Sequence, residues 1–239
     1  MKTPPSSPIL ARVYGVMAPL LVLGLIWAIG SAGLTLPPRY WALIGLALLL
    51  LAMSPELSFF NIVIREERET IVRPVIGTVV VFGLPLPIPM NVLEERTRIL
   101  AVNIGGAVVP VVVGSILLYI SYQVSGPRVI ALFLVALLVT TLATFASSKV
   151  IPGVGIAVPW LVPPLASSTT VALMAGTGVV QAFVAYAAGV MGSLLGADVI
   201  RLLIDYDRLM SMTVFASIGG VGVFDGIFLT GALSLILTL

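Results

Sequence analysis

The feature that most constrains this chain is a series of apolar runs, most of them long enough to cross a lipid bilayer. A helix needs about 20 residues to cross roughly 30 Å of hydrocarbon. Hydrophobic residues make up 59% of the chain and charged residues 9%, whereas a soluble domain is nearer ~45–50% and ~25%. We therefore predict an all-α membrane protein with about seven transmembrane helices and the lipid bilayer as its main partner. The runs are Val13–Leu36, Tyr40–Met53, Ile99–Tyr122, Val129–Ser147, Val154–Ala175, Val179–Ile204 and Ser217–Leu239.

The chain contains no cysteine and no histidine. Their absence excludes disulfides, thiol nucleophiles, iron–sulfur clusters and ordinary zinc sites, so we expect no metal and no cofactor. The net charge is +2, but its basic residues are spread over several loops and form no stripe that would bind nucleic acid.

Lysine and arginine are distributed unevenly over the predicted loops. With a cytoplasmic N-terminus, two basic residues lie outside, Arg39 and Arg128. The other ten lie inside: Lys2, Arg12, Arg65, Arg68, Arg73, Arg96, Arg98, Lys149, Arg201 and Arg208. The positive-inside rule therefore predicts a multi-pass cell-membrane protein with its N-terminus in the cytoplasm and its C-terminus outside.

One sizeable stretch, 54–98, interrupts the apolar runs on the predicted cytoplasmic side. Asn61–Arg65 and Ile76–Phe82 are rich in Ile and Val, and the sequence REERE separates them. This pattern predicts two short strands of a small hairpin at the membrane surface. The alternating prolines of Leu84–Met90 require extended backbone. We predict a single integral membrane domain over 1–239 that carries this insertion.

Two acidic residues, Asp198 and Asp225, fall within apolar runs. Each carboxylate costs at least ~2.5 kcal/mol at the middle of a membrane helix, which makes a functional role the default hypothesis. Asp198 lies six residues before Ile204, about 9 Å from that helix end, and Asp225 lies eight residues after Ser217, about 12 Å from the other. On consecutive antiparallel helices the two carboxylates would share a similar depth.

Small residues flank both aspartates. Gly192 and Gly196 precede Asp198 at GxxxG spacing, and Gly222 and Gly226 surround Asp225 in the same way. Such spacing lets helix backbones approach closely, so we expect these glycines to form the contact between the two helices. Two neighbouring carboxylates share one proton, and one then acts as base towards water while the other acts as acid towards a peptide carbonyl.

The sequences NIGGAVVP, GVGIAVPWLVPPL, GSLLGADVIRL and ASIGGVGVFDGIFLTG resemble those of an uncharacterised family of prokaryotic membrane proteins. GVFDGIF is also similar to the G-x-G-D motif of presenilin-type intramembrane aspartyl proteases. That resemblance implies catalytic roles for Asp225 and Asp198 and a membrane-embedded peptide as substrate. It also implies a substrate-binding role for Pro163, Pro164 and Leu165, in place of that family's Pro-Ala-Leu segment.

Alternatives to the protease hypothesis remain open at this point. The same aspartates suit an ion- or proton-coupled transporter, and the glycine spacing suits a non-catalytic membrane scaffold. Asp198 has a possible structural partner in Arg201, three residues further on. Asn103 fits either an interhelical hydrogen bond or a substrate contact. Finally, the four prolines between 152 and 164 predict a break in the fifth span.

Overall fold

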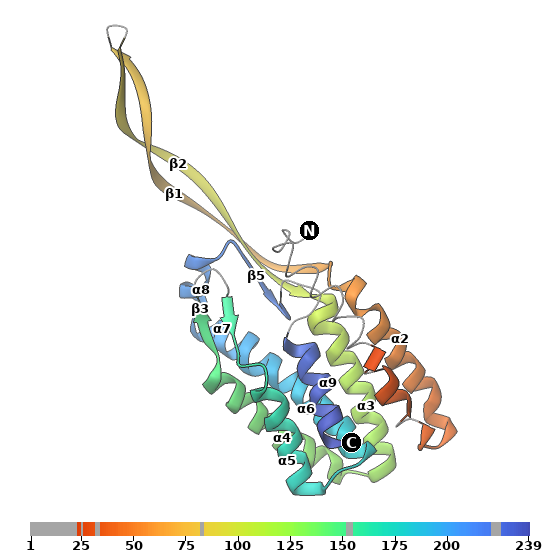
Figure 1. The fold of residues 1–239 in the computed structure, drawn as a ribbon. Coiled ribbons are helices and arrows are strands. Elements are labelled where there is room, and N and C mark those ends of the chain that lie inside the picture. The colour runs from red at the N-terminus through yellow and green to blue at the C-terminus, as the bar shows by residue number, and fades with distance from the viewer. Residues whose placement is uncertain (1–22, 25, 32–33, 82–83, 152–154, 221–225) are drawn as a thin grey trace.

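The computed structural model describes residues 23–24, 26–31, 34–81, 84–151, 155–220 and 226–239 (Figure 1). Its helices and strands form an apolar bundle from which one long hairpin projects (Figure 1). The helices are α2 (Trp41–Leu57), α3 (Val109–Ser125), α4 (Arg128–Ser147), α5 (Val162–Ala175), α6 (Val179–Ser193), α7 (Arg201–Ile204), α8 (Tyr206–Met212) and α9 (Gly226–Thr238). The strands are β1 (Asn61–Val81), β2 (Leu84–Asn103), β3 (Lys149–Ile151), β4 (Gly155–Ala157) and β5 (Phe215–Ile218). Short 3-10 and π-helical segments complete the set: η1 (Pro38–Tyr40), η2 (Ile104–Val108) and η3 (Leu194–Ile200).

The prediction of an all-α protein with about seven transmembrane helices is wrong. In the described residues, four helices are long and apolar enough to cross a membrane: Pro38–Leu57, Ile104–Ser125, Arg128–Ser147 and Val179–Ile204. These four are compatible with a membrane protein. Two further apolar helices, α5 and α9, are shorter, and a three-stranded and a two-stranded sheet accompany the bundle. The predicted first span falls mainly outside the described residues.

The continuous helix formed by α6, η3 and α7 lies at the centre of the bundle. From Ala182 to Val190 every residue of α6 is buried, and α3, α4, α5 and α9 all pack against this helix. Helix α4 lies at the periphery and exposes Leu134, Leu138 and Leu142. A helix that is apolar all round is typical of a buried core position, and an exposed leucine face is typical of contact with lipid.

The predicted break in the fifth span is confirmed. Lys149–Ile151 and Gly155–Ala157 form the antiparallel strands β3 and β4, and helix begins at Val162. Pro163 and Pro164 lie in the first turn of α5. A backbone N–H has no helical partner there, so the N–H that proline lacks costs no hydrogen bond. The predicted seventh span is also shorter than expected, because β5 occupies its first residues and α9 begins at Gly226.

The hairpin is far longer than the small insertion predicted from sequence. Strand β1 continues through the REERE sequence, which was expected to separate two strands, with one register shift between Val63 and Arg65. Strand β2 pairs with it from Leu84 to Asn103, so the proline-rich sequence is extended as predicted, but within a strand. Cross-strand charge pairs explain why REERE continues the ribbon: Arg98 forms an ion pair with Glu69 at 2.6 Å.

Strand β5 joins the base of this hairpin from far along the chain. It pairs in parallel with Ile99–Val102 of β2, which gives the strand order β1-β2-β5. The hairpin, α8 and β5 thus lie at one end of the bundle (Figure 1). At the opposite end the loop between α5 and α6 meets the C-terminal helix, because the Gly178 N–H donates to the Thr238 carbonyl at 3.0 Å.

Candidate functional site

Asp198 lies in the π-helical segment η3 of the central helix. Its side chain is half-buried, and its Oδ2 accepts a 2.7 Å hydrogen bond from the Gly219 N–H. A π-helical turn inside an α-helix rotates the following side chains and occurs often at functional sites. The local geometry thus turns the carboxylate towards the loop that follows β5.

Gly219 and Gly220 form that loop, and both adopt left-handed backbone with φ of 83° and 78°. A side chain at Gly219 would also lie 2.7 Å from the backbone nitrogen of Ala107. A Cβ on Gly106 would in turn collide with the Gly219 carbonyl oxygen. Glycines at these positions are therefore required for the loop to reach Asp198.

Asn103 organises the same region from the end of β2. It is fully buried, and its Nδ2 donates to the Ser58 carbonyl at 2.8 Å and to Asn61 Oδ1 at 3.2 Å. Its Oδ1 accepts from the Gly106 N–H at 2.6 Å and so caps the helix that continues as α3. Asn103 thus lies in a strand and not within a helical span, and its amide holds the end of α2, β1 and the start of the α3 helix together.

Ser217 on β5 completes what we call the polar junction, formed by Asn61, Asn103, Ser217, Gly219 and Asp198. The Ser217 hydroxyl donates to Asn61 Oδ1 at 2.9 Å. Asn61 Nδ2 is buried and has no hydrogen-bond partner among the described residues. The polar junction thus joins four segments that are distant in sequence. It contains the carboxylate of Asp198 and the amide donor of Asn61 that has no partner among the described residues.

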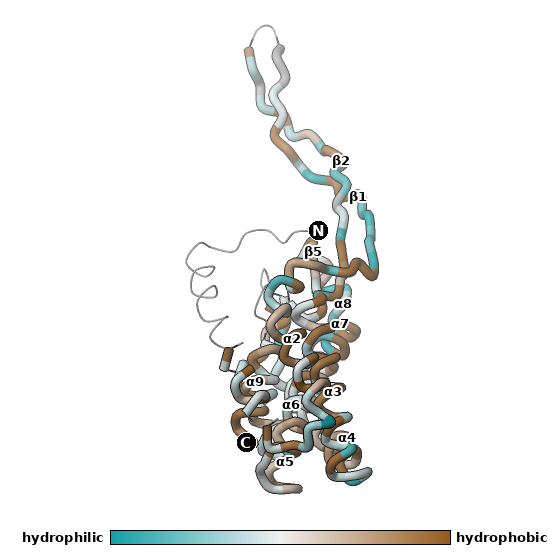
Figure 2. Tube along the Cα trace, turned by 90° about the vertical axis from the view of Figure 1, so that its right-hand side faces the viewer, coloured by the Kyte–Doolittle hydropathy of each residue, from teal (hydrophilic) through white to brown (hydrophobic). Residues whose placement is uncertain are grey.

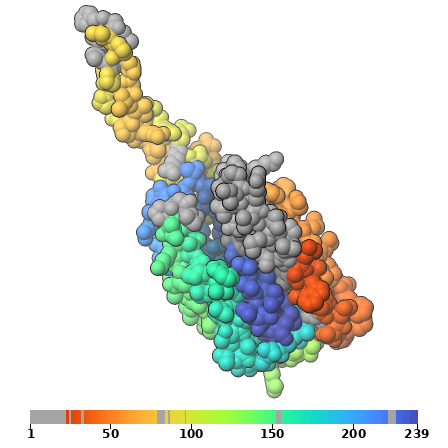
Figure 3. All heavy atoms as spheres, in the orientation of Figure 1, coloured from red at the N-terminus to blue at the C-terminus, as the bar shows by residue number. Residues whose placement is uncertain are grey.

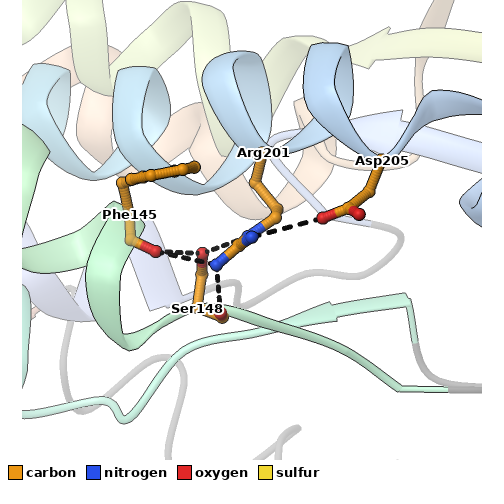
Figure 4. Close-up of polar contacts among 4 residues, drawn as sticks. All are labelled: Phe145, Ser148, Arg201 and Asp205. Carbon is orange, nitrogen blue, oxygen red and sulfur yellow. Dashed lines mark hydrogen bonds and ion pairs between the residues drawn. The ribbon is translucent and has the colours of Figure 1, made fainter.

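Arg201, which the sequence suggested as a partner for Asp198, forms an ion pair with Asp205. Its guanidinium caps the C-terminal end of α4 and contacts Phe145, Ser148 and Asp205 (Figure 4). Nη2 donates to the Phe145 and Ser148 carbonyls at 3.0 and 2.7 Å, and Nε donates to Ser148 Oγ at 2.9 Å. Nη1 forms the ion pair with Asp205 at 3.3 Å. Arginine suits a helix C-terminus because it offers several donors to carbonyls that lack partners.

The structure places two of the predicted packing glycines against a different helix. A Cβ on Gly192 would lie 2.7 Å from Thr140, and one on Gly196 would lie 3.0 Å from the Phe145 backbone nitrogen, both on α4. Among the described residues, no atom outside the neighbouring turn of α9 lies within 4 Å of the position of a Cβ on Gly226. Gly222, like Asp225, lies outside the described residues.

The contact between α6 and α9 uses other glycines. Gly189 of α6 faces Ser234 and Thr230 of α9, and Gly231 of α9 faces Tyr186 and Val190 of α6. The small residues in this contact are thus Gly189 and Gly231, and not the glycines named from the sequence. GxxxG spacing did not reveal them.

The predicted substrate-binding residues on α5 differ in exposure. Pro163 and Pro164 are buried in the first helical turn, and Leu165 is exposed. Further along α5, the Ser167 hydroxyl hydrogen-bonds Ser234 of α9 at 2.7 Å within the core. Within the described residues, no cluster of acidic side chains could hold a metal ion.

Two residues at the base of the hairpin tie it to α8. The Tyr206 hydroxyl donates to Glu67 at 3.2 Å, and the Arg65 guanidinium lies 5.4 Å from the centre of the Tyr206 ring. Desolvation and the hydrogen bond to Glu67 both raise the pKa of Tyr206, so it stays protonated and able to donate. The hairpin is thereby fixed at its base.

Comparison with known proteins identifies a family. A family model described as "Protein of unknown function (DUF1614)" matches residues 56–237. The chain belongs to the DUF1614 family. The match extends from the end of α2 through the hairpin to α9, so the DUF1614 region contains the polar junction and both aspartates. No curated protein and no solved structure matches the chain. The family assignment agrees with the predicted uncharacterised family, and the presenilin resemblance finds no support in these comparisons.

Proposed function

We propose that this chain is an intramembrane aspartyl protease-like protein that uses Asp198 and Asp225 to hydrolyse a peptide bond in a membrane-embedded substrate. The observation that carries the proposal is the hydrogen bond from Gly219 to the Asp198 carboxylate. It attaches the central helix to the loop from which the chain leads, six residues later, to Asp225. Asp225 follows this loop in the sequence and lies outside the described residues.

The hydrogen bond also suggests how the two roles divide. A backbone N–H stabilises negative charge on a carboxylate, so we assign the base to Asp198 and the acid to Asp225. Asp198 removes a proton from water, whose oxygen bonds to the carbonyl carbon while Asp225 protonates the carbonyl oxygen. The tetrahedral intermediate collapses when Asp198 gives its proton to the amide nitrogen, Asp225 takes a proton back from one hydroxyl of the intermediate, and the C–N bond breaks, which yields a carboxylic acid and an amine.

A peptidomimetic with a hydroxyl in place of the scissile carbonyl tests this assignment, because it resembles the tetrahedral intermediate. A photoreactive form of such a probe should label the protein in membranes and be displaced by excess unlabelled probe. Labelling should fall at least about tenfold in Asp198→Asn and Asp225→Asn, since binding draws on the protonated pair.

Asp207→Asn is the matched control, because this carboxylate is exposed in the first turn of α8. It should label like the unmodified protein. Equal labelling of all three variants would contradict the catalytic assignment.

A proton-coupled transporter is the second candidate, and the two half-length helices favour it. Non-helical backbone in β3–β4 precedes α5, and β5 precedes α9. Discontinuous helices of this kind hold substrates and coupling ions in transporters. Proton uptake into liposomes that is lost in Asp198→Asn, without probe labelling of the unmodified protein, would favour this function over proteolysis.

We further propose that the hairpin end of the bundle faces the cytoplasm and the C-terminal end of α9 faces outside. All basic residues of the described segments except Arg39 and Arg128 belong to the hairpin, to α7 and α8, or to β3, which follows α4. These elements lie at the same end of the bundle (Figure 1). The orientation follows from the positive-inside rule.

A further inference from the structure

Asn61 lies at the base of the hairpin, which Figure 3 shows projecting from the bundle as a narrow arm. Its Nδ2 is buried and donates to no acceptor among the described residues. Its Oδ1, in contrast, accepts two hydrogen bonds, from Asn103 Nδ2 at 3.2 Å and from Ser217 Oγ at 2.9 Å. Buried side-chain donors are nearly always bonded in folded proteins. An unbonded donor costs the fold stability, which a ligand that supplies an acceptor recovers.

The surrounding contacts fix which end of the Asn61 amide carries the donor. Asn103 donates to the Ser58 carbonyl and accepts from the Gly106 N–H, so its own amide cannot be turned over. Its Nδ2 therefore faces Asn61. Turning the Asn61 amide over would set the two NH₂ groups against each other, and an NH₂ group accepts no hydrogen bond. Oδ1 of Asn61 is therefore the atom that faces Asn103, and Nδ2 is directed elsewhere.

A tight turn brings this amide and Asp198 to the same part of the structure. Residues 217–220 form a β-turn, since the Gly220 N–H donates to the Ser217 carbonyl at 3.2 Å. Asn61 binds the side chain of the first residue of this turn, and Asp198 binds the N–H of the third. The ends of a β-turn lie within ~7 Å of each other, which is about the length of two residues of extended chain. The Asn61 donor and the Asp198 carboxylate thus lie within reach of one short peptide segment.

The charge of the polar junction selects the kind of acceptor that Asn61 can bind. Among the five residues of the junction, Asp198 alone has an ionisable side chain, and its charge is negative. A phosphate or carboxylate beside it would be repelled. A metal cation is also unsuitable, because the amide nitrogen is only a donor. A neutral carbonyl oxygen meets both conditions, and each residue of a peptide backbone supplies one.

We propose that Asn61 is a substrate-binding residue whose Nδ2 donates a hydrogen bond to a main-chain carbonyl of an extended peptide. The peptide class of the ligand rests on the proposed function, whereas the position of the donor does not. Asn61 takes no part in proton transfer. Its bond fixes the peptide along its length and so decides which peptide bond lies beside Asp198.

A photoreactive peptide of leucine and alanine, with an ordinary amide at every position, tests this binding without requiring catalysis. In membranes it should label the unmodified protein. Asn61→Asp keeps an oxygen for Asn103 and Ser217 but loses the donor. This variant should lower the labelling roughly tenfold, as expected for one lost hydrogen bond in a buried site.

A series of peptides, each with one amide replaced by an alkene of similar shape, identifies the carbonyl that Asn61 binds. One member should label the unmodified protein roughly tenfold less than the parent peptide, and this difference should disappear in Asn61→Asp. Such non-additivity reports a direct contact between the two groups that were changed. It does not depend on the negative charge that the variant adds. Ser217→Ala is the matched control, because it leaves Nδ2 and the bond to Asn103 in place, and it should preserve the difference.

Three outcomes would overturn the proposal: no labelling of the unmodified protein, equal labelling of Asn61→Asp, or an alkene series in which no position couples to Asn61. Failure of the proposed function gives a different result. The hydroxyl probe would then label without regard to Asp198 and Asp225, while peptide labelling would still depend on Asn61. Labelling by the hydroxyl probe that requires both aspartates, with no effect of Asn61→Asp on either probe, would refute the role of Asn61 alone.

Discussion

At the scale of single residues, Arg201 makes the most concentrated set of polar contacts described here. Its guanidinium bonds two carbonyls and a hydroxyl at the end of α4 and pairs with Asp205. Arg201→Lys keeps the charge but loses the planar fork, and leaves buried acceptors unsatisfied at a cost of about 1–3 kcal/mol. We expect a clearly lower melting temperature in detergent.

Asp205→Asn is the comparison variant for Arg201→Lys. The Asp205 side chain is 24% exposed, and partly exposed ion pairs contribute little, about 0–1 kcal/mol. If Asp205→Asn lowered the melting temperature as much as Arg201→Lys, the ion pair with Asp205, and not the cap on α4, would be the main contribution of Arg201 to stability.

At the scale of elements, α5, α6 and α9 meet where Gly189 faces the hydrogen bond between Ser167 and Ser234. A methyl group at Gly189 would collide with the Ser234 hydroxyl and lie 3.0 Å from that of Ser167. Overpacking of this kind costs about 1–3 kcal/mol. Gly189→Ala should therefore lower the melting temperature in detergent.

Gly45→Ala is the matched control, because in the part of the chain that the structure describes nothing beyond the local backbone of α2 lies within 4 Å of the added methyl group. Alanine favours helix by about 1 kcal/mol over glycine, so Gly45→Ala should leave stability unchanged or raise it. Equal losses of stability in the two variants would show that the loss at Gly189 does not come from contact of the added methyl group with Ser167 and Ser234.

At the scale of the whole molecule, the two ends of the bundle should lie on opposite sides of the membrane. A cysteine in place of Arg68, whose side chain is 74% exposed in the hairpin, should react with a membrane-impermeant maleimide only after the cells are opened. A cysteine in place of Arg39, before α2, should react in intact cells. The reverse pattern would invert the proposed orientation.

Local sequence patterns predicted the elements whose structure depends on neighbouring residues. The long helices α4 and α6 follow from uninterrupted apolar runs, and the break before α5 follows from its prolines. The length of the hairpin was harder to predict from the sequence. Figure 2 shows the reason: apolar and polar segments alternate along the hairpin, as they would in several short strands. Its full length depends on cross-strand pairs that link residues far apart in sequence.

The candidate site was predicted only in part, for the same reason. Asp198 was identified by its cost in a membrane helix, but its bond to Gly219 depends on β5, whose partner β2 lies before helices α3 to α8. The glycine pairs of NIGG and ASIGG were the one local signal of the loop contact between Gly106 and Gly219.

The parallel pairing of β2 with β5 also constrains the order of events during synthesis. Strand β2 leaves the ribosome well before β5, so its free edge at Ile99–Val102 waits unpaired while α3 to α8 are made. Contacts between such distant segments form late because a long loop must close first. The Asp198 carboxylate therefore gains its Gly219 partner only when most of the bundle has assembled. A partly synthesised chain would hold the aspartate without this bond to Gly219 until β5 has been made.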